Sequence, residues 1–251
     1  MQNMSNKMTN YGYKVLITTS GIGSRLGELT KTTNKALVKV VGKPALDYIL
    51  NSYPKDMEFV ITVGYLKEQV ISYIKENYPR LNVIFAEVDK FDGPGTSMGY
   101  SMLQARQYLN CPFIIQCNDT LVFEPIPSPV EGNWNAGTFG PSALSYTSFK
   151  RVGDSISKIA DKGATDYDLL HIGFVGIKDH QLFWDCLAEL YEKNPNDSVL
   201  NDTRTMNVMM ERGAEFKPVE YKLWLDIGNP DALKLTEKYL LEHPDLLNAN
   251  R

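Results

Sequence analysis

The feature of this sequence that most constrains its fold is a regular alternation of two kinds of segment through its first half. Apolar runs of strand length occupy residues 13–19, 58–63, 81–86 and 112–117. Segments whose apolar residues recur at helical spacing lie between them, at 44–53, 66–78 and 96–108. Such alternation requires crossover connections, which place a largely parallel sheet between two layers of helices. The sequence therefore predicts an α/β fold.

The second half of the chain is less regular. Proline and glycine residues mark turns through residues 124–142, and apolar residues at helical spacing predict a helix over 182–191. Apolar residues alternate along 219–226, which predicts a single strand that ends at Asp226. No polar linker or repeat divides the chain, so we expect a single domain over residues 11–251, after a flexible N-terminal tail of residues 1–10.

The composition excludes several classes of protein. With 43% hydrophobic and 22% charged residues, the 251-residue chain has the make-up of an ordinary globular protein. Its net charge of −4 argues against a nucleic-acid partner, and its longest apolar runs are too short to span a membrane. The N-terminus lacks the apolar core of a signal peptide, and the three cysteines show neither pairing nor metal spacing. These features predict a cytoplasmic protein that binds neither nucleic acid nor membrane.

A glycine-rich loop, Ser-Gly-Ile-Gly-Ser-Arg at residues 20–25, directly follows the first strand-like run. Loops of this kind present backbone N–H groups to phosphate oxygens, because glycine allows a close approach. The third glycine comes one residue too late for a dinucleotide fingerprint, and the sequence has no G-K-[ST] of a Walker loop. Arg25 offers a forked guanidinium that suits a triphosphate, and Lys35 follows it before an apolar stretch. The loop therefore predicts a nucleoside-triphosphate site of another type.

Two aspartates close strand-like runs, Asp119 after residues 113–118 and Asp226 at the end of 219–226. Ligands of open α/β sheets bind beyond the carboxyl ends of the strands, so both carboxylates are expected to converge there. A triphosphate-bound Mg²⁺ takes one or two carboxylates besides phosphate oxygens, which predicts Mg²⁺ as the cofactor. After Asp226, Asn229 and Pro230 predict the N-cap and the first residue of a helix.

Several motifs resemble the signature of the nucleoside-triphosphate transferases, the family of the sugar-phosphate nucleotidyltransferases or pyrophosphorylases. The signature is carried by Leu16-Ile-Thr-Thr-Ser-Gly-Ile-Gly-Ser-Arg-Leu26, Thr30, Asn34-Lys-Ala-Leu37 and Gly42-Lys-Pro44. Later landmarks follow in order at 118–119, 159–162, 171–174 and 224–228, so the resemblance covers about residues 13–240. It implies a GT-A-like (Rossmann-like) three-layer sandwich with a mixed, mostly parallel central sheet. It also implies a nucleotide-binding half of about residues 11–120 and an acceptor-binding half of about 121–240.

The resemblance implies roles for individual residues. Arg25 and Lys35 take the catalytic roles, and Asp119 and Asp226 bind the metal. The nucleotide-binding residues are Thr19, Ser20, Gly21, Ile22, Gly23, Ser24, Gly95, Thr96, Ser97 and Asn118. The acceptor-binding residues are Asp161, Lys162 and Gly173, and Lys162 is expected to grip the phosphate of the acceptor.

Two departures from the family's pattern bear on this site. Asn34 replaces the customary proline before Lys35, which is expected to loosen the local geometry of the lysine. Asp161 stands where sugar-using members usually carry glutamate, which puts a sugar contact at this position in doubt.

Three further segments bear on the choice of nucleotide. Residues 63–69 and 73–78 are similar to bacterial choline-phosphate cytidylyltransferases, and to cytidylyltransferases that activate other small phosphorylated metabolites such as phosphoglutamine. Residues 93–101 occupy the place where the family reads the base, and they lack the Gln-x-x-x-Gly-Leu-Ala pattern of the thymidylyl enzymes. CTP is therefore favoured over other nucleotides.

The resulting prediction is an enzyme, a nucleotidyltransferase that couples CTP to a small phosphorylated acceptor and releases pyrophosphate. Its product is expected to be a CDP-linked precursor of capsule or other cell-surface polysaccharide. Three alternatives stay open: a sugar-1-phosphate nucleotidyltransferase using UTP, GTP or dTTP, a GT-A glycosyltransferase, and a non-catalytic regulatory homologue. The intact loop, Arg25, Lys35 and both aspartates favour catalysis. The sequence leaves open which acceptor is used and whether the chain forms a homo-oligomer.

Overall fold

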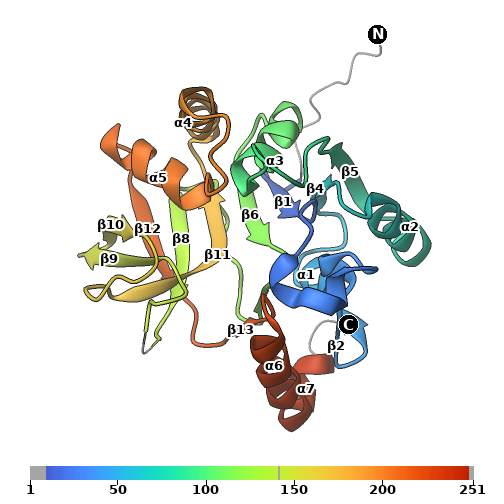
Figure 1. The fold of residues 1–251 in the computed structure, drawn as a ribbon. Helices are drawn as coiled ribbons and strands as arrows, with labels where there is room; N and C mark the ends of the chain where they lie inside the picture. The colour runs from blue at the N-terminus through green and yellow to red at the C-terminus, as the bar shows by residue number, and fades with distance from the viewer. Residues whose placement is uncertain (1–9, 141, 249–251) are drawn as a thin grey trace.

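The computed structural model describes residues 10–140 and 142–248, and a nine-stranded mixed sheet forms its centre (Figure 1). In chain order the strands of this sheet are β1 (Lys14–Thr18), β4 (Glu58–Val63), β5 (Asn82–Glu87), β6 (Phe113–Cys117), β8 (Asn133–Thr138), β9 (Ser148–Val152), β10 (Ser155–Ala160), β11 (Leu169–Ile177) and β12 (Phe216–Glu220). Seven of them lie in the order β10-β9-β11-β6-β1-β4-β5, while β8 pairs with β11 and with β12.

The first half of the sheet is built from parallel strands joined by helices, as the alternation in the sequence predicts. β4 and β6 flank β1, and β5 lies beside β4, each pair being parallel. The connecting helices are α1 (Ala45–Asn51), α2 (Lys67–Asn77) and α3 (Met98–Ala105), which a short 3-10 helix η3 (Arg106–Tyr108) continues. The predicted strands and helices of this half are confirmed.

Antiparallel pairing begins where the second half of the chain joins the sheet. β11 runs antiparallel to β6, and β8 and β9 both pair with β11. The remaining helices are α4 (His180–Lys193), α5 (Asp202–Glu211), α6 (Pro230–Glu242) and α7 (Pro244–Asn248). α4 contains the predicted helix over 182–191, and α6 begins at Pro230 with the Asn229 side chain as its N-cap, as expected.

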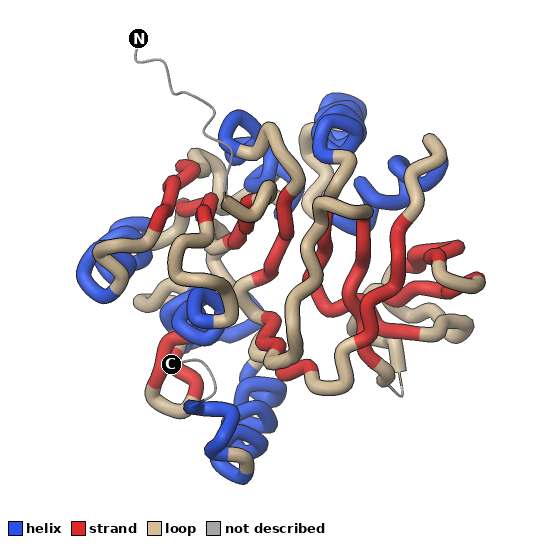
Figure 2. The backbone as a smooth tube through the Cα atoms, turned by 180° about the vertical axis from the view of Figure 1, so that it is seen from behind, coloured by secondary structure: helices blue, strands red, loops and turns tan. Residues whose placement is uncertain are grey.

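Two hydrophobic cores, one on each face of the sheet, hold the layers together. Successive residues of a strand point to opposite faces, so Val15 and Ile17 join one core and Leu16 joins the other. Side chains of α1, α2 and α6 complete the first core, and those of α3, α4 and α5 the second. Figure 2 shows the strands running across the molecule, with helices above, below and to the left of them. The predicted three-layer α/β class with a mixed central sheet is confirmed.

Shorter elements lie outside the main sheet. They are the 3-10 helices η1 (Ser24–Thr30) and η2 (Lys35–Leu37), the paired strands β2 (Lys39–Val40) and β3 (Lys43–Pro44), and the paired strands β7 (Thr120–Val122) and β13 (Trp224–Asp226). The β7–β13 pair places the segment that follows Asp119 beside the segment that ends at Asp226.

The prediction of one strand over residues 219–226 is wrong. β12 pairs with β8 and ends at Glu220, and the chain resumes as β13, which pairs with β7. Between the two strands, the backbone N–H groups of Lys222 and Leu223 both donate to Glu124 Oε1, at 2.7 and 2.9 Å. The carboxylate of Glu124 thus stabilises a turn at residues 221–223, which the alternation of apolar residues does not predict.

The predicted N-terminal tail, residues 1–10, lies outside the described residues except for Asn10. Within residues 10–140 and 142–248, no helix combines the length and the apolar character that crossing a membrane requires. The single domain and its division into a nucleotide-binding and an acceptor-binding half stay predictions.

Candidate active site

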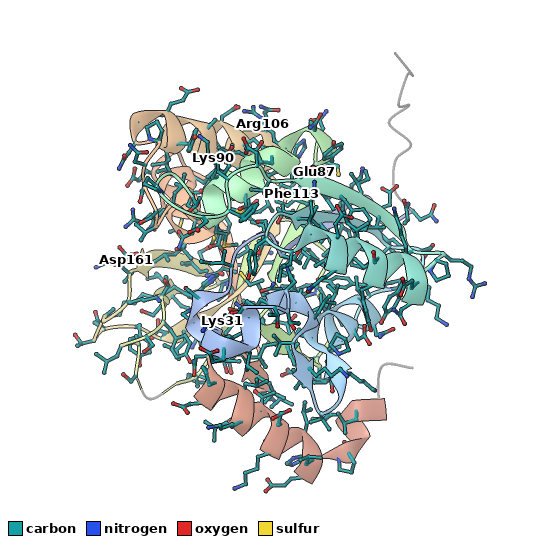
Figure 3. The ribbon with its side chains drawn as sticks, turned by 45° about the vertical axis from the view of Figure 1, so that its right-hand side comes forward. Lys31, Glu87, Lys90, Arg106, Phe113 and Asp161 are labelled. Carbon is teal, nitrogen blue, oxygen red and sulfur yellow. The ribbon has the colours of Figure 1, made fainter. Side chains whose placement is uncertain are left out.

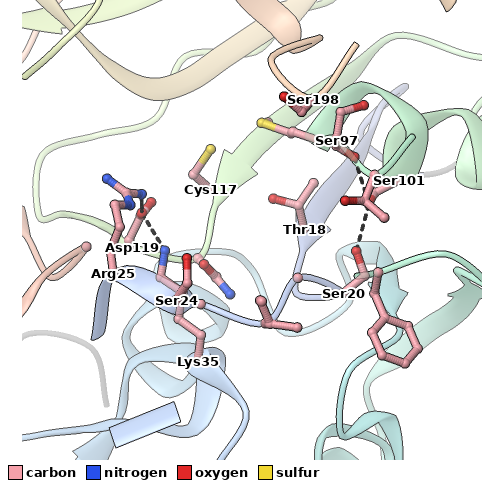
Figure 4. A pocket seen from close by; sticks show the side chains of 18 of the residues that line it. Thr18, Ser20, Ser24, Arg25, Lys35, Ser97, Ser101, Cys117, Asp119 and Ser198 are labelled. Atoms are coloured by element: carbon pink, nitrogen blue, oxygen red, sulfur yellow. Dashed lines mark hydrogen bonds and ion pairs between the residues drawn. The ribbon is translucent and has the colours of Figure 1, made fainter. Parts of the chain in front are cut away.

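The glycine-rich loop lines a cavity of about 450 Å³ at the carboxyl ends of β1 and β6 (Figure 4). The loop residues 20–25 and Lys35 form one wall. The other lining residues are Thr18, Lys90, Phe91, residues 96–98, Ser101, residues 117–119, Ser198 and Gly228. Because β1 and β6 are parallel neighbours, their carboxyl ends bring the loop and Asp119 to the same edge of the sheet.

Gly23 explains how the loop and Lys35 approach each other. Its φ is +68°, and a Cβ added to it would lie 3.1 Å from both Lys35 Cβ and Thr30 Cγ2. The Thr30 hydroxyl also donates to the Gly23 carbonyl at 3.0 Å, which closes the loop against the end of η1. A side chain at this position would therefore crowd Lys35 and would also strain the backbone, whose φ lies in the left-handed region.

Lys35 and Arg25 place two positive charges beside Asp119. The Lys35 ammonium donates to Asp119 Oδ2 at 2.6 Å, and an Arg25 guanidinium N–H donates to the same oxygen at 3.3 Å. The Lys35 side chain is 13% exposed and that of Arg25 62%, so the lysine is the more desolvated cation. Burial raises the pKa of Asp119, but the charges of Lys35 and Arg25 outweigh it and hold the pKa below its usual value. Asp119 is therefore ionised at neutral pH.

Asn34 holds Lys35 in place, so the expected loosening of the lysine is wrong. The Asn34 side chain is fully buried, and its amide donates to the carbonyl oxygens of Thr19 at 3.1 Å and Tyr65 at 2.7 Å. Its Oδ1 accepts the backbone N–H of Ala36 at 2.9 Å and thereby caps η2, the turn that begins at Lys35. A proline would restrict the backbone before Lys35 through its ring. Asn34 restricts it instead through hydrogen bonds to three separate backbone groups.

Asp226 reaches the same edge of the sheet from β13. Its Oδ1 accepts the Gly228 backbone N–H at 2.7 Å, and its Oδ2 accepts the Tyr146 hydroxyl at 2.9 Å. Burial, and in smaller part the negative charge of Asp119, raise the pKa of Asp226. Burial and the charge of Asp226 also raise the pKa of Tyr146 to about 12, so this hydroxyl keeps its proton at neutral pH.

The carboxylates of Asp119 and Asp226 fit a Mg²⁺ ion that also binds phosphate. A Cβ added to Gly228 would lie 3.0 Å from Asp226 Oδ1 and 3.2 Å from Asp119 Oδ2. The missing side chain of Gly228 therefore leaves a space that two carboxylate oxygens face, with Arg25 Nη1 at 3.5 Å on its border. Mg²⁺ usually takes one or two carboxylates together with phosphate oxygens and water. Within residues 10–140 and 142–248, no three histidine, cysteine or acidic side chains gather into a site made of protein ligands alone.

Hydroxyl side chains of the loop and of α3 meet at another part of the cavity. The Ser20 hydroxyl donates to Ser101 Oγ at 2.9 Å, as Figure 4 shows. Ser97 Oγ accepts the Tyr100 backbone N–H at 3.0 Å and so caps the start of α3. These contacts tie the phosphate-loop side of the cavity to the segment predicted to read the base.

Most of the predicted nucleotide-binding residues lie at this cavity. Those that line it are Ser20, Gly21, Ile22, Gly23, Ser24, Thr96, Ser97 and Asn118. Thr19 is instead buried and donates its hydroxyl to the Thr62 carbonyl. A Cβ added to Gly95 would lie 3.1 Å from the Pro195 carbonyl, which shows that Gly95 packs against a neighbouring turn. Direct contact of any of these residues with a nucleotide stays a prediction.

Other lining residues were not assigned to the site individually from the sequence, which marked only the segments 93–101 and 224–228 around some of them. They are Thr18, Lys90, Phe91, Met98, Ser101, Cys117, Ser198 and Gly228. Ser101 lies one helical turn after Ser97, so the spacing of the two serines was a usable signal. Ser198 lies between α4 and α5, and that segment reaches the site because Gly99 donates its N–H to the Leu200 carbonyl. This bond joins residues about a hundred positions apart, so no local sequence pattern predicts it.

The three residues predicted to bind the acceptor, Asp161, Lys162 and Gly173, are not among the residues that line this cavity. Asp161 and Lys162 are exposed in the turn after β10, and Figure 3 shows Asp161 at the outer edge of the molecule. Gly173 has a φ of +70° and lies behind the cavity wall, since a Cβ added to it would meet Cys117 Sγ at 2.9 Å. Their part in acceptor binding stays a prediction.

Known proteins similar to this chain include two cytidylyltransferases, although no family model matches it. The 2-aminoethylphosphonate cytidylyltransferase of Lancefieldella rimae is 25% identical over 214 residues, which are 82% of this chain and 84% of that protein. The choline-phosphate cytidylyltransferase of Streptococcus pneumoniae is 34% identical over 113 residues, which are 43% of this chain and 45% of that protein. The chain is a homologue of nucleotidyltransferases. The predicted resemblance to nucleotidyltransferases and the predicted class of enzyme are thereby confirmed.

This nucleotidyltransferase homologue is also 25% identical to the bifunctional protein GlmU of Methanococcus maripaludis over 237 residues. They make up 90% of the chain but 54% of GlmU, so the chain spans about half the length of that relative. Among solved structures, CTP:phosphocholine cytidylyltransferase from Streptococcus pneumoniae matches with a TM-score of 0.75 at 20% identity, covering 91% of this chain and 99% of that one. A UDP-glucose pyrophosphorylase complexed with UDP-glucose matches with a TM-score of 0.77 at 16% identity, covering 92% and 99%. At these identities the structural matches support the fold alone.

Proposed function

We propose that this protein transfers a cytidylyl group from CTP to a small acceptor that carries a phosphate or a phosphonate, and releases pyrophosphate. One observation carries the proposal: the glycine-rich loop, Arg25, Lys35 and two convergent carboxylates meet at a single edge of the sheet. Each of these groups suits a polyanionic substrate, and together they match what a triphosphate with its Mg²⁺ requires.

The proposed reaction is an in-line displacement at the α-phosphorus of the nucleotide. An oxygen of the acceptor's phosphate or phosphonate forms a new bond to that phosphorus as the bond to the leaving pyrophosphate breaks. The attacking oxygen is already ionised at neutral pH, so no side chain has to remove a proton. The task of the protein is therefore to align two anions and to offset their repulsion.

The residues of the site divide this task between them. The backbone N–H groups of residues 20–25 and the Arg25 guanidinium would hold the β- and γ-phosphates. Lys35 lies deeper in the cavity and would offset the negative charge that develops on the α-phosphoryl group and on the leaving group. Asp119 and Asp226 would hold Mg²⁺, which supplies further positive charge to the reacting phosphates when it is bound.

The choice of CTP and of the acceptor class rests on the relatives. The two cytidylyltransferase relatives are named for 2-aminoethylphosphonate and for choline phosphate. Both compounds are small, with an anionic phosphorus group at one end and a nitrogen at the other. We therefore propose an acceptor of this kind, and the predicted use of the product in capsule or other cell-surface polysaccharide stays a prediction.

A second candidate is a sugar-1-phosphate nucleotidyltransferase that uses UTP, GTP or dTTP. The fold allows this reaction too, since a UDP-glucose pyrophosphorylase shares the fold at 16% identity. The same site would serve both reactions, because each joins a phosphate oxygen to the α-phosphorus of a nucleotide. The acceptor and the base would distinguish them.

The test is a pyrophosphate-release screen of the purified protein. CTP, UTP, GTP and dTTP are each combined with 2-aminoethylphosphonate, phosphocholine or glucose 1-phosphate in the presence of Mg²⁺. We expect release with CTP and one of the first two acceptors, abolished by EDTA and restored by added Mg²⁺. Release only with glucose 1-phosphate would favour the second candidate. No release with any pair, from a protein that binds CTP, would favour a non-catalytic homologue.

A further inference from the structure

Tyr146 contacts the site without lining the cavity that holds the phosphate loop. It lies between β8 and β9, and its hydroxyl donates to Asp226 Oδ2 at 2.9 Å across 80 positions of sequence. No feature of the sequence pointed to this residue. Its partner is the carboxylate whose other oxygen faces the space above Gly228.

We propose that Tyr146 is a positioning residue for the metal site: its hydroxyl orients the Asp226 carboxylate so that Oδ1 faces the cation shared with Asp119. This inference rests on the proposed function, because it assigns Tyr146 to the same Mg²⁺ site. Partners that orient a ligating carboxylate typically change metal affinity by 10- to 100-fold when they are removed.

Two donors, one on each oxygen, define the orientation of the carboxylate. The Gly228 N–H at 2.7 Å from Oδ1 comes from the same turn as Asp226 and would move with it. The Tyr146 hydroxyl comes from a different segment, so it ties the Asp226 side chain to the rest of the protein. Without this second donor only the Gly228 N–H restrains rotation of the carboxylate about its χ2 angle, which varies broadly in aspartate.

Tyr146 is itself held in place. Its ring meets the Trp224 ring edge-to-face, with the centroids 5.2 Å apart. Trp224 belongs to β13, where it pairs with Val122 in β7. The Ile227 N–H donates to the Asp119 carbonyl at 3.1 Å, so the segments carrying the two carboxylates are also bonded to each other. Tyr146 thus packs on the strand that ends at Asp226 and donates to the carboxylate at its end.

The same loop is bonded to the turn predicted to bind the acceptor. The Ala143 carbonyl accepts the N–H of Tyr146 at 3.2 Å and that of Gly163 at 2.8 Å. Gly163 directly follows Lys162, the predicted phosphate-gripping residue. A short chain of hydrogen bonds therefore links this turn, through Tyr146, to Asp226.

The experiment compares Tyr146→Phe with the matched control Tyr167→Phe. Tyr167 also lies in the second half, and its hydroxyl donates to the Gly140 carbonyl at 3.0 Å rather than to either carboxylate. Phenylalanine keeps the ring that packs on Trp224 and removes only the hydroxyl. Binding of Mn²⁺ alone to each full-length protein is measured from the EPR signal of free Mn²⁺, and urea unfolding is measured alongside.

We expect Tyr146→Phe to raise the Mn²⁺ dissociation constant by about tenfold and to raise the Mg²⁺ concentration that gives half-maximal pyrophosphate release. Tyr167→Phe should bind Mn²⁺ as the wild type does. A purely structural role would lower the urea midpoint of Tyr146→Phe and leave its Mn²⁺ affinity unchanged, and that result overturns the inference. A wild-type protein that binds Mn²⁺ but releases no pyrophosphate overturns the proposed function, and the Mn²⁺ comparison still decides the role of Tyr146.

Discussion

Replacing Asn34 by alanine tests whether this buried side chain fixes the position of Lys35. The substitution removes three hydrogen bonds: two that the side-chain amide donates to backbone carbonyls and one that Oδ1 accepts from the Ala36 N–H. All three are formed by a side chain with no solvent exposure, so water does not replace them. Each is worth about 1 kcal/mol net, which gives a loss of about 3 kcal/mol in the free energy of unfolding.

Urea denaturation of the protein without substrates measures this loss directly. For a chain of this size the corresponding fall in Tm is about 6–12 °C. The turnover number should fall as well, by up to about 10²-fold, because η2 loses its cap and Lys35 its defined position. Asn51→Ala is the matched control, since its amide donates to the Asp47 carbonyl and the Tyr78 hydroxyl at the exposed end of α1.

The control variant should change the free energy of unfolding by less than about 0.5 kcal/mol, as most surface substitutions do. If Asn34→Ala unfolds at the same urea concentration as Asn51→Ala, the buried hydrogen bonds do not stabilise the loop and this account of Lys35 is refuted. A stable Asn34→Ala protein with unchanged turnover would lead to the same conclusion.

Three further substitutions test the site. Lys35→Ala should lower kcat by about 10²–10³-fold in the pyrophosphate assay, whereas Lys39→Ala, at an exposed position, should leave kcat unchanged. Equal effects of the two substitutions would show that Lys35 is not the catalytic cation. Arg25→Ala should weaken CTP binding by roughly ten- to a hundredfold in isothermal titration without changing the affinity for the acceptor, and wild-type CTP affinity would contradict the phosphate role of the loop. Gly228→Ala should weaken Mn²⁺ binding, because the new Cβ would lie 3.0 Å from Asp226 Oδ1 and 3.2 Å from Asp119 Oδ2 and would push the two oxygens aside. Its control is Gly132→Ala, where a Cβ would meet no described atom within 4 Å, and equal Mn²⁺ affinity in the two variants would refute the metal site.

The sequence by itself determined the architecture of the first half and the place of the loop that lines the cavity. Strands and helices there follow from apolar periodicity, which is a local property, since one face of each element must be buried. The loop at residues 20–25 was recognisable because its closely spaced glycines and its arginine directly follow a strand-like run, a pattern that depends on neighbouring residues alone. The same holds for Asn229 and Pro230, whose capping of α6 depends on neighbouring residues alone.

Only the tertiary structure decided how these parts are held together. Asn34 was expected to loosen Lys35, yet its side chain reaches the carbonyl of Tyr65, which no local pattern reveals. The strand expected over 219–226 is divided because Glu124, about a hundred positions away, accepts the N–H groups of its turn. Tyr146 contacts Asp226 across a similar separation. Hydrogen bonds of this kind join single residues from distant segments, so they leave no periodic signal in the sequence and appear only when the chain has folded.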